Sequence, residues 1–137
     1  MKQMSTYSVR ISRCADIRKT LSATAGAYRK AVDFFIDVCM EEWDTVSSGK
    51  GQTGKVNAVE ALTIRTSKRK TVPYDFGKDF YKFPSYLRRA AIAEAVGKVS
   101  SYRSNLRNWE AADPQTRGKR PGSPSAGYVY PAMYRDN

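Results

Sequence analysis

The stretch from residue 20 to residue 44 reads TLSATAGAYRKAVDFFIDVCMEEWD and decides the fold of the chain. Its apolar side chains recur at steps of three and four residues, which is the period of an amphipathic α-helix. The spacing predicts one helix of about seven turns with Arg29, Lys30 and Asp37 on its polar face. Cys39 falls on the apolar face, so we interpret it as a small buried thiol. The predicted buried stripe comprises Leu21, Ala25, Tyr28, Val32, Phe35, Ile36, Cys39, Met40 and Trp43.

A second long amphipathic run begins after Pro84 and ends before Pro114. Ser85 is suited to cap its N-terminus, and Pro114 cannot continue a helix, so both boundaries are marked. Several small residues, among them Ala91 and Ala95, allow another helix to approach closely. The predicted buried stripe of this helix comprises Leu87, Ala91, Ile92, Ala95, Val96, Val99, Leu106 and Trp109.

The segment between these two helices is less regular. Residues 46–55, VSSGKGQTGK, are rich in Gly and Ser and predict a flexible loop. Asn57 is suited to cap a shorter helix that runs from Ala58 to about Thr66. Residues 71–83 contain one proline, Pro73, and many aromatic residues, so they predict an extended aromatic segment.

Short strands are expected near the two ends of the chain. Tyr7, Val9 and Ile11 alternate with polar residues, which predicts a strand with one buried face. Residues 113–127, DPQTRGKRPGSPSAG, predict a loop, and residues 128–130 predict a second strand. The expected fold class is therefore mainly α, of the α+β kind, with about three helices and flanking strands that need partners.

Charge points to the class of partner. The chain has 137 residues and a formal net charge of +11, from 24 Lys and Arg against 13 Asp and Glu. The positive excess is spread over residues 1–35, 46–83 and 84–137, and only residues 36–45 are acidic. A basic surface drawn from several elements favours a polyanionic partner, most simply a nucleic acid.

Composition also excludes several classes of protein. The chain has no His, and its two cysteines, Cys14 and Cys39, form no CxxC pair, so His triads and Cys or His zinc sites are excluded. No apolar run approaches the ~18 residues of a membrane span, and residues 1–13 show no signal-peptide core. The acids form no spaced set that could hold two metal ions. We therefore expect a cytoplasmic protein with no metal, no cofactor and no membrane partner.

Residues 49–55, GKGQTGK, match the glycine and lysine spacing of a phosphate-binding loop. The next residue is Val56, where such a loop needs Ser or Thr to reach the metal ion. The segment also follows the acidic end of a helix, whereas the motif requires a preceding buried strand. We interpret it as a solvated loop that can contact a phosphate backbone.

Two features are candidates for contact with nucleic acid. Arg88 and Arg89 fall in the first turn of the third helix, where cations oppose the helix dipole and where free N–H groups attract phosphate. The aromatic segment is interleaved with Lys78 and Lys82, which fits either a base-stacking surface or a hydrophobic cluster beneath a loop. Its rings are Tyr74, Phe76, Phe80, Tyr81 and Phe83, and the third helix continues the basic content with Lys98, Arg103 and Arg107.

Several phrases resemble the N-terminal part of TnpB-type proteins. The most distinctive is FPSYLRRAAI at residues 83–92, and AYRKAVDF at residues 27–34, GKRP at residues 118–121 and YRDN at residues 134–137 are also similar. TnpB-type proteins are accessory transposases of bacterial insertion sequences. They are RNA-guided DNA endonucleases related to the type V CRISPR effectors, and the resemblance covers almost the whole chain.

The resemblance implies a domain plan. Residues 1–13 would form the first strand of a wedge-type β-barrel, residues 14–112 a helical recognition domain, and residues 113–137 a basic loop and a returning barrel strand. The RuvC-like nuclease carboxylates and the four zinc cysteines of the family have no counterpart here. We therefore expect a recognition portion that does not cut DNA alone. Its expected partners are a guide-type RNA and a double-stranded DNA target, in the bacterial cytoplasm.

The resemblance and the residue types together define an expected binding set. Arg88, Arg89 and Asn57 are expected at base edges, because Arg and Asn form bidentate contacts with bases. Basic residues of the loops are expected at phosphates, which supply affinity without sequence preference. The set comprises Gln52, Thr53, Asn57, Tyr86, Arg88 and Arg89 from the resemblance, and Lys68, Arg69, Lys70, Lys82, Arg103, Lys119 and Arg120 from charge.

Three alternatives stay open at this point. The chain could be a stand-alone DNA- or RNA-binding regulator. It could instead dock on a separately encoded nuclease chain through strand addition by Tyr128, Val129 and Tyr130. A third alternative is a folded remnant of a longer gene, without function.

Overall fold

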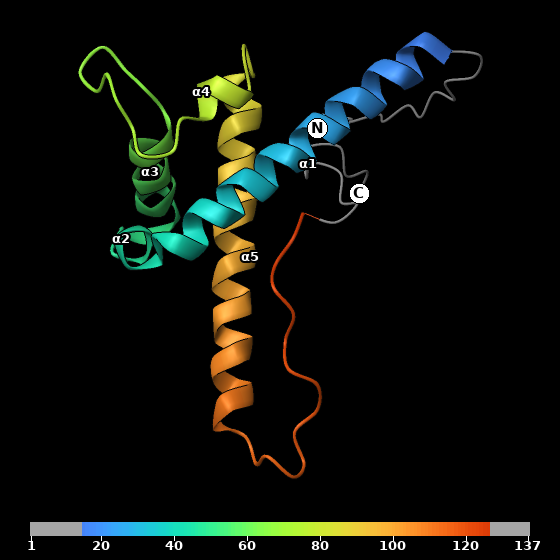
Figure 1. Ribbon diagram of the computed structural model, residues 1–137, viewed down its shortest axis with the longest axis vertical. Coiled ribbons are helices and arrows are strands. Elements are labelled where there is room, and N and C mark those ends of the chain that lie inside the picture. Colours follow the sequence, from blue (N-terminus) through green and yellow to red (C-terminus); the bar gives the residue numbers. More distant parts are fainter. Residues whose placement is uncertain (1–14, 127–137) are drawn as a thin grey trace, which may run out of the picture.

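The computed structural model describes residues 15–126, which form five α-helices followed by an irregular segment (Figure 1). No β-strand occurs within residues 15–126, so the predicted helical character is confirmed for this part of the chain. The strands predicted at residues 7–11 and 128–130 lie outside the described residues. The helices are α1 (Ala15–Glu41), α2 (Trp43–Ser47), α3 (Gly51–Thr63), α4 (Phe76–Asp79) and α5 (Ser85–Ala111).

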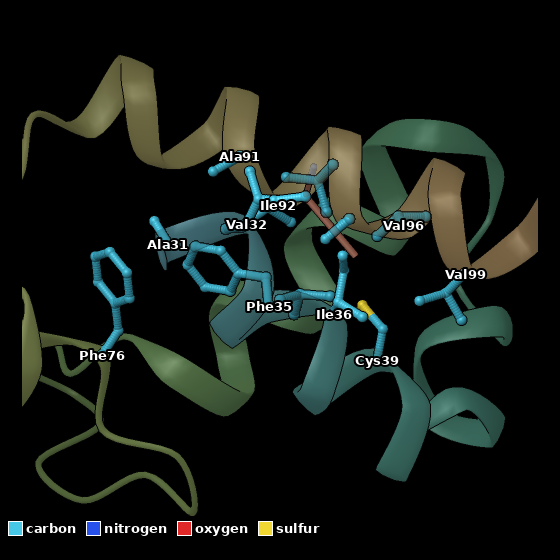
Figure 2. Packing of buried hydrophobic residues seen from close by; sticks show 14 of the residues in the cluster. Ala31, Val32, Phe35, Ile36, Cys39, Phe76, Ala91, Ile92, Val96 and Val99 are labelled. Carbon is cyan, nitrogen blue, oxygen red and sulfur yellow. The ribbon is translucent and has the colours of Figure 1, made fainter. Parts of the chain in front are cut away.

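The core forms where α1 crosses α5 (Figures 1 and 2). Phe35 of α1 and Ile92 of α5 are fully buried, and each such side chain stabilises the fold by about 1.5–3 kcal/mol. Ala91 and Ala95 are also fully buried, and their short side chains let the helix backbones approach closely. The predicted stripes supply most of this core: Tyr28, Val32, Phe35, Ile36 and Cys39 on α1, and Leu87, Ala91, Ile92, Ala95, Val96 and Val99 on α5.

The first helix differs from the prediction at both ends. α1 begins at Ala15 and ends at Glu41, and the chain bends at Glu42 before α2. The bend carries Val46 of α2 into the core, where it is fully buried. Helical spacing cannot reveal this bend, because Trp43 continues the apolar stripe whether or not the helix is straight.

The acidic end of α1 has a partner from a distant segment. The hydroxyl of Tyr74 lies 2.6 Å from Oε2 of Glu41 and 3.0 Å from Oε1 of Glu42, so it can donate to either carboxylate. These hydrogen bonds, the one to Glu41 above all, raise the pKa of Tyr74 above its usual range. The contact ties the segment before α4 to the end of α1.

The flexible loop predicted over residues 46–55 is wrong, because most of this segment is helical. Only residues 48–50 connect α2 to α3, and the glycines belong to this sharp corner. A Cβ on Gly49 would lie 2.5 Å from the carbonyl carbon of Gly54, and Gly51 has a φ of +65°. The glycine content therefore reflects close backbone approach at Gly49, which leaves no room for a side chain, and a left-handed backbone at Gly51, which favours glycine.

The second predicted helix also begins earlier than expected. Asn57 lies exposed inside α3 and is not its N-cap, because the helix already starts at Gly51. α3 ends at Thr63, and the side chain of Arg69 holds the carbonyl groups there. Its Nε donates to the carbonyl of Ile64 at 3.0 Å, and its guanidinium lies 3.5 Å from the carbonyl of Glu60.

The aromatic segment over residues 71–83 contains the short helix α4 rather than being extended throughout. Phe76 is buried and stacks on Phe80 and Phe35, with ring centroids 4.5 Å and 4.8 Å apart. Phe34 and Phe83 contact the ring of Phe76 edge-on. The phenylalanines therefore form a hydrophobic cluster that packs against the core, and they are not an exposed stacking surface.

After α5 the chain returns beside that helix as an irregular strap, residues 112–126 (Figure 1). Nε1 of Trp109 donates to the carbonyl of Gly118 at 2.8 Å, and the guanidinium of Arg117 lies 3.6 Å from the Trp109 ring centroid. At the far end of the strap, the backbone N–H of Ala126 donates to Asp33 at 2.8 Å. Two residues of the predicted α5 stripe thus lie outside the buried core, Leu106 and Trp109.

Candidate nucleic-acid interface

The candidate interface lies where α4 meets the start of α5 (Figure 1). The connection after α3, the helix α4 and the start of α5 line a common pocket there. Tyr81 and Tyr86 are 82% and 62% exposed, and among the side chains that the structure describes (residues 19, 20 and 22–126) they are the large hydrophobic ones most open to solvent. We call this surface, residues 64–89, the α4 end. Its exposed cations include Arg65, Lys68, Lys70, Lys78 and Lys82.

Arg88 and Arg89 lie in the first turn of α5 and both face Glu60 of α3. NH1 of Arg89 lies 3.0 Å and 3.1 Å from the two carboxylate oxygens of Glu60, and NH2 of Arg88 lies 3.8 Å from one of them. The carboxylate offsets the unfavourable position of two cations at a helix N-terminus. The prediction that Ser85 caps this helix is wrong, because Pro84 occupies the N-cap position and no side chain caps the turn.

The two arginines differ in how much of each is available to a ligand. The side chain of Arg89 is 47% exposed, whereas that of Arg88 is 22% exposed. Arg89 therefore keeps donors open to solvent beside its ion pair. Arg88 is less exposed and belongs to the lining of the pocket at this end.

The three consecutive cations after α3 have different environments. Lys68 and Lys70 are exposed, as phosphate contacts require. Arg69 is half-buried, and its guanidinium is already engaged by the carbonyl groups at the end of α3. Backbone hydrogen bonds between Thr66 and Arg69 close the turn that presents the two lysines.

Lys82 combines an unusual backbone with an aromatic contact. Its φ of 56° is left-handed, which is uncommon for a residue other than glycine. Its ammonium nitrogen lies 5.4 Å from the ring centroid of Tyr81, within the range of a cation–π contact. The backbone turn thus places a cation and an exposed ring side by side at the α4 end.

The remaining predicted residues lie outside residues 64–89. Gln52 and Thr53 are in the first turn of α3, and Nε2 of Gln52 lies 3.5 Å from the carbonyl oxygen of Ala93 in α5. Asn57 lies one turn before Glu60 in α3, and Glu60 pairs with Arg89. α3 thus runs from Gln52 toward the two arginines along α5, so these predicted residues lie on the helix next to the α4 end.

Arg103, Lys119 and Arg120 are further away still. The guanidinium of Arg103 lies 5.8 Å from the ring centroid of Trp43, on the part of α5 that faces α2. Lys119 and Arg120 are exposed on the strap near the C-terminal end of α5, which is about 40 Å from its start for a helix of that length. One short ligand cannot contact both ends.

The acids of the basic segment were missed as site residues. Residues 46–83 contain Glu60, Asp75 and Asp79, and the first two hold arginines. NH2 of Arg65 lies 3.3 Å from Oδ2 of Asp75, and Glu60 holds the pair described above. The available sequence signal was their scarcity: few acids in a basic segment tend to find cationic partners.

Other features of the described residues carry less chemistry. Within residues 15–126 no three Cys, Asp or Glu side chains could hold a metal ion, and none of the helices is long and apolar enough to cross a membrane. Burial raises the pKa of the Cys39 thiol to about 12, so it is a poor nucleophile. A groove of about 580 Å³ lies between α5 and the strap, lined by residues such as Glu94, Lys98 and Tyr102.

These features define a small helical protein with one basic and aromatic end. A family model matches residues 5–137, and the chain belongs to the Aq_aa04 family. It is similar to the uncharacterized protein aq_aa04 of Aquifex aeolicus (strain VF5), with 26% identity over 132 residues, covering 85% of this chain and 72% of that relative. No solved structure matches the chain.

Proposed function

We propose that this protein binds nucleic acid at the α4 end and catalyses no reaction by itself. The observation that carries the proposal is the exposure of Tyr81 and Tyr86, with Lys82 over the Tyr81 ring, on a surface that also exposes Lys68 and Lys70. Aromatic faces stack on bases without demanding a particular sequence, and lysines neutralise phosphates. Glu60 and Asp75, two of the three acidic residues in residues 46–83, pair with arginines. The charge that this surface exposes to solvent is therefore positive.

In its finer form, the proposal makes the chain a recognition portion related to TnpB-type proteins. Its ligands are then a guide-type RNA and a double-stranded DNA target. The phrase at residues 83–92 supports this, because it spans the last part of the α4 end and the first turns of α5. The similar phrase at residues 27–34 lies on α1 and includes core residues that pack against α5. The two similar segments thus include residues of the α4 end and residues of α1 that pack in the core.

A salt-series fluorescence-anisotropy titration tests the proposal. The ligands are a structured RNA from the protein's own locus, an unrelated RNA and duplex DNA. Tight binding to the RNA from its own locus, with a modest salt slope, supports guide recognition. Equal and steeply salt-dependent binding to all three ligands supports binding by charge alone. Absence of binding to every ligand at low salt refutes the proposal.

Paired variants locate the interface. The double variant Lys68→Ala/Lys70→Ala removes two phosphate contacts from the α4 end. We expect the salt slope to fall by about 1.4 for single-stranded ligands and by about 1.8 for duplex DNA. The matched control is Lys119→Ala/Arg120→Ala, which removes the same charge from the strap. If the control loses as much slope as the first variant, the interface is not at the α4 end.

The same titration decides how the protein works. Tight binding of one nucleic acid in the absence of any other protein supports a stand-alone regulator. Binding that requires a separately encoded nuclease chain supports a docking module instead.

A further inference from the structure

The turn that joins α4 to α5 exposes one ring and one cation between two anchored phenylalanines. Phe80 is the C-cap of α4, and both it and Phe83 are partly buried and pack against the hydrophobic core. The ring of Phe80 stacks on Phe76 with centroids 4.5 Å apart, and the ring of Phe83 contacts Phe76 edge-on at 5.5 Å. The two residues between them, Tyr81 and Lys82, are both exposed. The turn is therefore fixed on each side by a packed ring.

The backbone of this turn adopts an unusual conformation at Lys82. Its φ of 56° is left-handed, and within residues 15–126 it is the one residue other than glycine with a positive φ. Such conformations persist only where the surrounding structure imposes them, and they cluster at functional sites. The left-handed residue reverses the chain between Phe80 and Phe83, so both rings reach the same cluster and Tyr81 stays in solvent.

The ring of Tyr81 is available to a ligand. Tyr81 is 82% exposed, and the ammonium nitrogen of Lys82 lies 5.4 Å from its ring centroid. So little of the residue is covered that a ring face remains open. Single exposed apolar side chains are common on protein surfaces, but this one projects from a turn that is fixed on both sides. Binding to it therefore requires little additional ordering of the protein, which favours affinity.

We propose that Tyr81 is a stacking platform for an unpaired base and that the α4 end therefore selects single-stranded over double-stranded nucleic acid; this rests on the nucleic-acid binding proposed above. In a duplex, neighbouring base pairs cover both faces of each base, and a base must be unstacked before a side chain can reach a face. In a single strand, a base can stack on an aromatic side chain directly. Because every base has a π-face, the selection is by strand state and not by sequence.

The surroundings of the ring suit the phosphates and the next base of such a strand. The phosphate of a nucleotide is one sugar away from its base, so the cation of Lys82 is in place to contact the phosphate of the stacked nucleotide. Tyr86, in the first turn of α5, is 62% exposed and offers a second ring at the α4 end. A guide-type RNA with unpaired nucleotides meets these requirements, whereas a fully paired DNA duplex does not.

The test uses the full chain and three fluorescein-labelled DNA ligands: a single-stranded dodecamer of mixed sequence, an abasic strand of the same length, and the dodecamer paired with its complement. Anisotropy at one salt concentration measures the affinities. We expect the single strand to bind about tenfold more tightly than the abasic strand, which has the same phosphates and no bases. It should also bind more tightly than the duplex, although the duplex has more charge and would bind best by charge alone.

Variants of the turn separate the ring from the cation. Tyr81→Ala should weaken binding of the single strand about tenfold and leave the abasic strand unchanged, whereas Tyr81→Phe keeps the ring and should keep the affinity. The matched control Tyr102→Ala removes a tyrosine from the second half of α5, outside the α4 end, and should also keep it. Lys82→Gly removes the cation and leaves a residue that adopts the left-handed backbone freely. It should weaken binding of the single and abasic strands by the same factor.

The outcomes separate this proposal from the function on which it rests. If the single and abasic strands bind equally, or if the duplex binds as tightly as the single strand, stacking is overturned while binding by charge at the α4 end survives. If Tyr81→Ala weakens all three ligands equally, or weakens none of them, Tyr81 is not a stacking platform. If no ligand binds, both proposals fail.

A spectroscopic readout on the wild-type protein covers the case in which Tyr81→Ala disturbs folding. The ring of Tyr81 gives its own cross-peaks in an aromatic carbon–proton correlation spectrum, and Tyr81→Phe assigns them by removing them. The single strand should shift these cross-peaks, because a stacked base lies against the ring, and the abasic strand should leave them in place. Tyr81 cross-peaks that neither strand moves, or that both strands move equally, contradict the proposed platform.

Discussion

Replacing Glu60 by Gln removes the carboxylate that faces Arg88 and Arg89 and keeps the length of the side chain. The amide oxygen of glutamine still accepts a hydrogen bond from Arg89, so the geometry of the first turn of α5 should persist. The change therefore isolates the charge of Glu60. We expect it to weaken folding slightly and to strengthen binding to nucleic acid.

The stability effect follows from the exposure of the partners. Arg89 is 47% exposed and forms the shorter contact, and exposed ion pairs contribute about 0.2–1 kcal/mol. Glu60 is only 19% exposed, and Arg88 at 3.8 Å adds charge attraction, so the total lies near the top of that range, about 1 kcal/mol. For a domain of this size the melting temperature should fall by about 3–5 °C, measured by circular dichroism.

The binding effect has the opposite sign. Without the carboxylate, the two guanidinium groups have no intramolecular anion and can neutralise a phosphate instead. The magnitude of the salt slope should rise by about 0.7 for a single-stranded ligand, corresponding to one further phosphate contact. The same anisotropy titration measures it.

The control for this prediction is Glu110→Gln, which removes one negative charge from the exposed far end of α5. It should change the melting temperature little, because surface substitutions without partners are nearly neutral. A fall in affinity for Glu60→Gln, parallel to its loss of stability, would refute the reasoning. Glu60 would then position the arginines for the ligand and would not compete with it.

Two further predictions concern the corner and the core. Gly49→Ala should destabilise the protein by about 3 kcal/mol, because its Cβ would lie 2.5 Å from a backbone carbon of α3. By contrast, a Cβ on Gly26 of α1 meets nothing within 4 Å, so Gly26→Ala should stabilise the protein by about 0.5–1 kcal/mol. Urea unfolding measures both, and a neutral Gly49→Ala would contradict the account of the corner. In a Cys14→Ser background, iodoacetamide at pH 8 should label Cys39 at least about tenfold more slowly in the native protein than in guanidinium, because the thiolate is the nucleophile. Equal labelling rates would show that Cys39 is not buried. Burial also raises the pKa of the Cys39 thiol from 9.0 to about 12. The stability that this group contributes is therefore present below pH 9 and is lost as the pH rises toward 12.

Helical periodicity was sufficient to find the core of this protein. The stripes on α1 and α5 contain residues such as Val32, Phe35, Ile92 and Val96, which are buried as their spacing predicted. Periodicity works here because a helix presents every third or fourth residue to one side whatever it packs against. It failed for Trp109, whose ring contacts Gly118 and Arg117 of the strap instead of packing in the core.

Glycine composition misled the reading of residues 46–55. A cluster of Gly and Ser indicates a loop when the chain is solvated, but it equally permits two helix ends to meet at close range. Only the position of Gly49 against Gly54 distinguishes these cases. A single sequence does not indicate which backbone segments will approach one another closely.

Some features of the candidate site could likewise be predicted from the sequence, and others could not. The sequence by itself determined that the protein is basic, that Arg88 and Arg89 lie near the start of the helix now labelled α5, and that aromatic and basic residues are interleaved before that helix. Composition and local spacing are enough for such statements. The tertiary structure alone decided that Phe76 packs inward while Tyr81 stays in solvent. It also decided that Glu60 pairs with the arginines and that Asp75 shares a pocket with Arg88. These are contacts between segments far apart in the chain, and their energies depend on burial and distance, which no local pattern encodes.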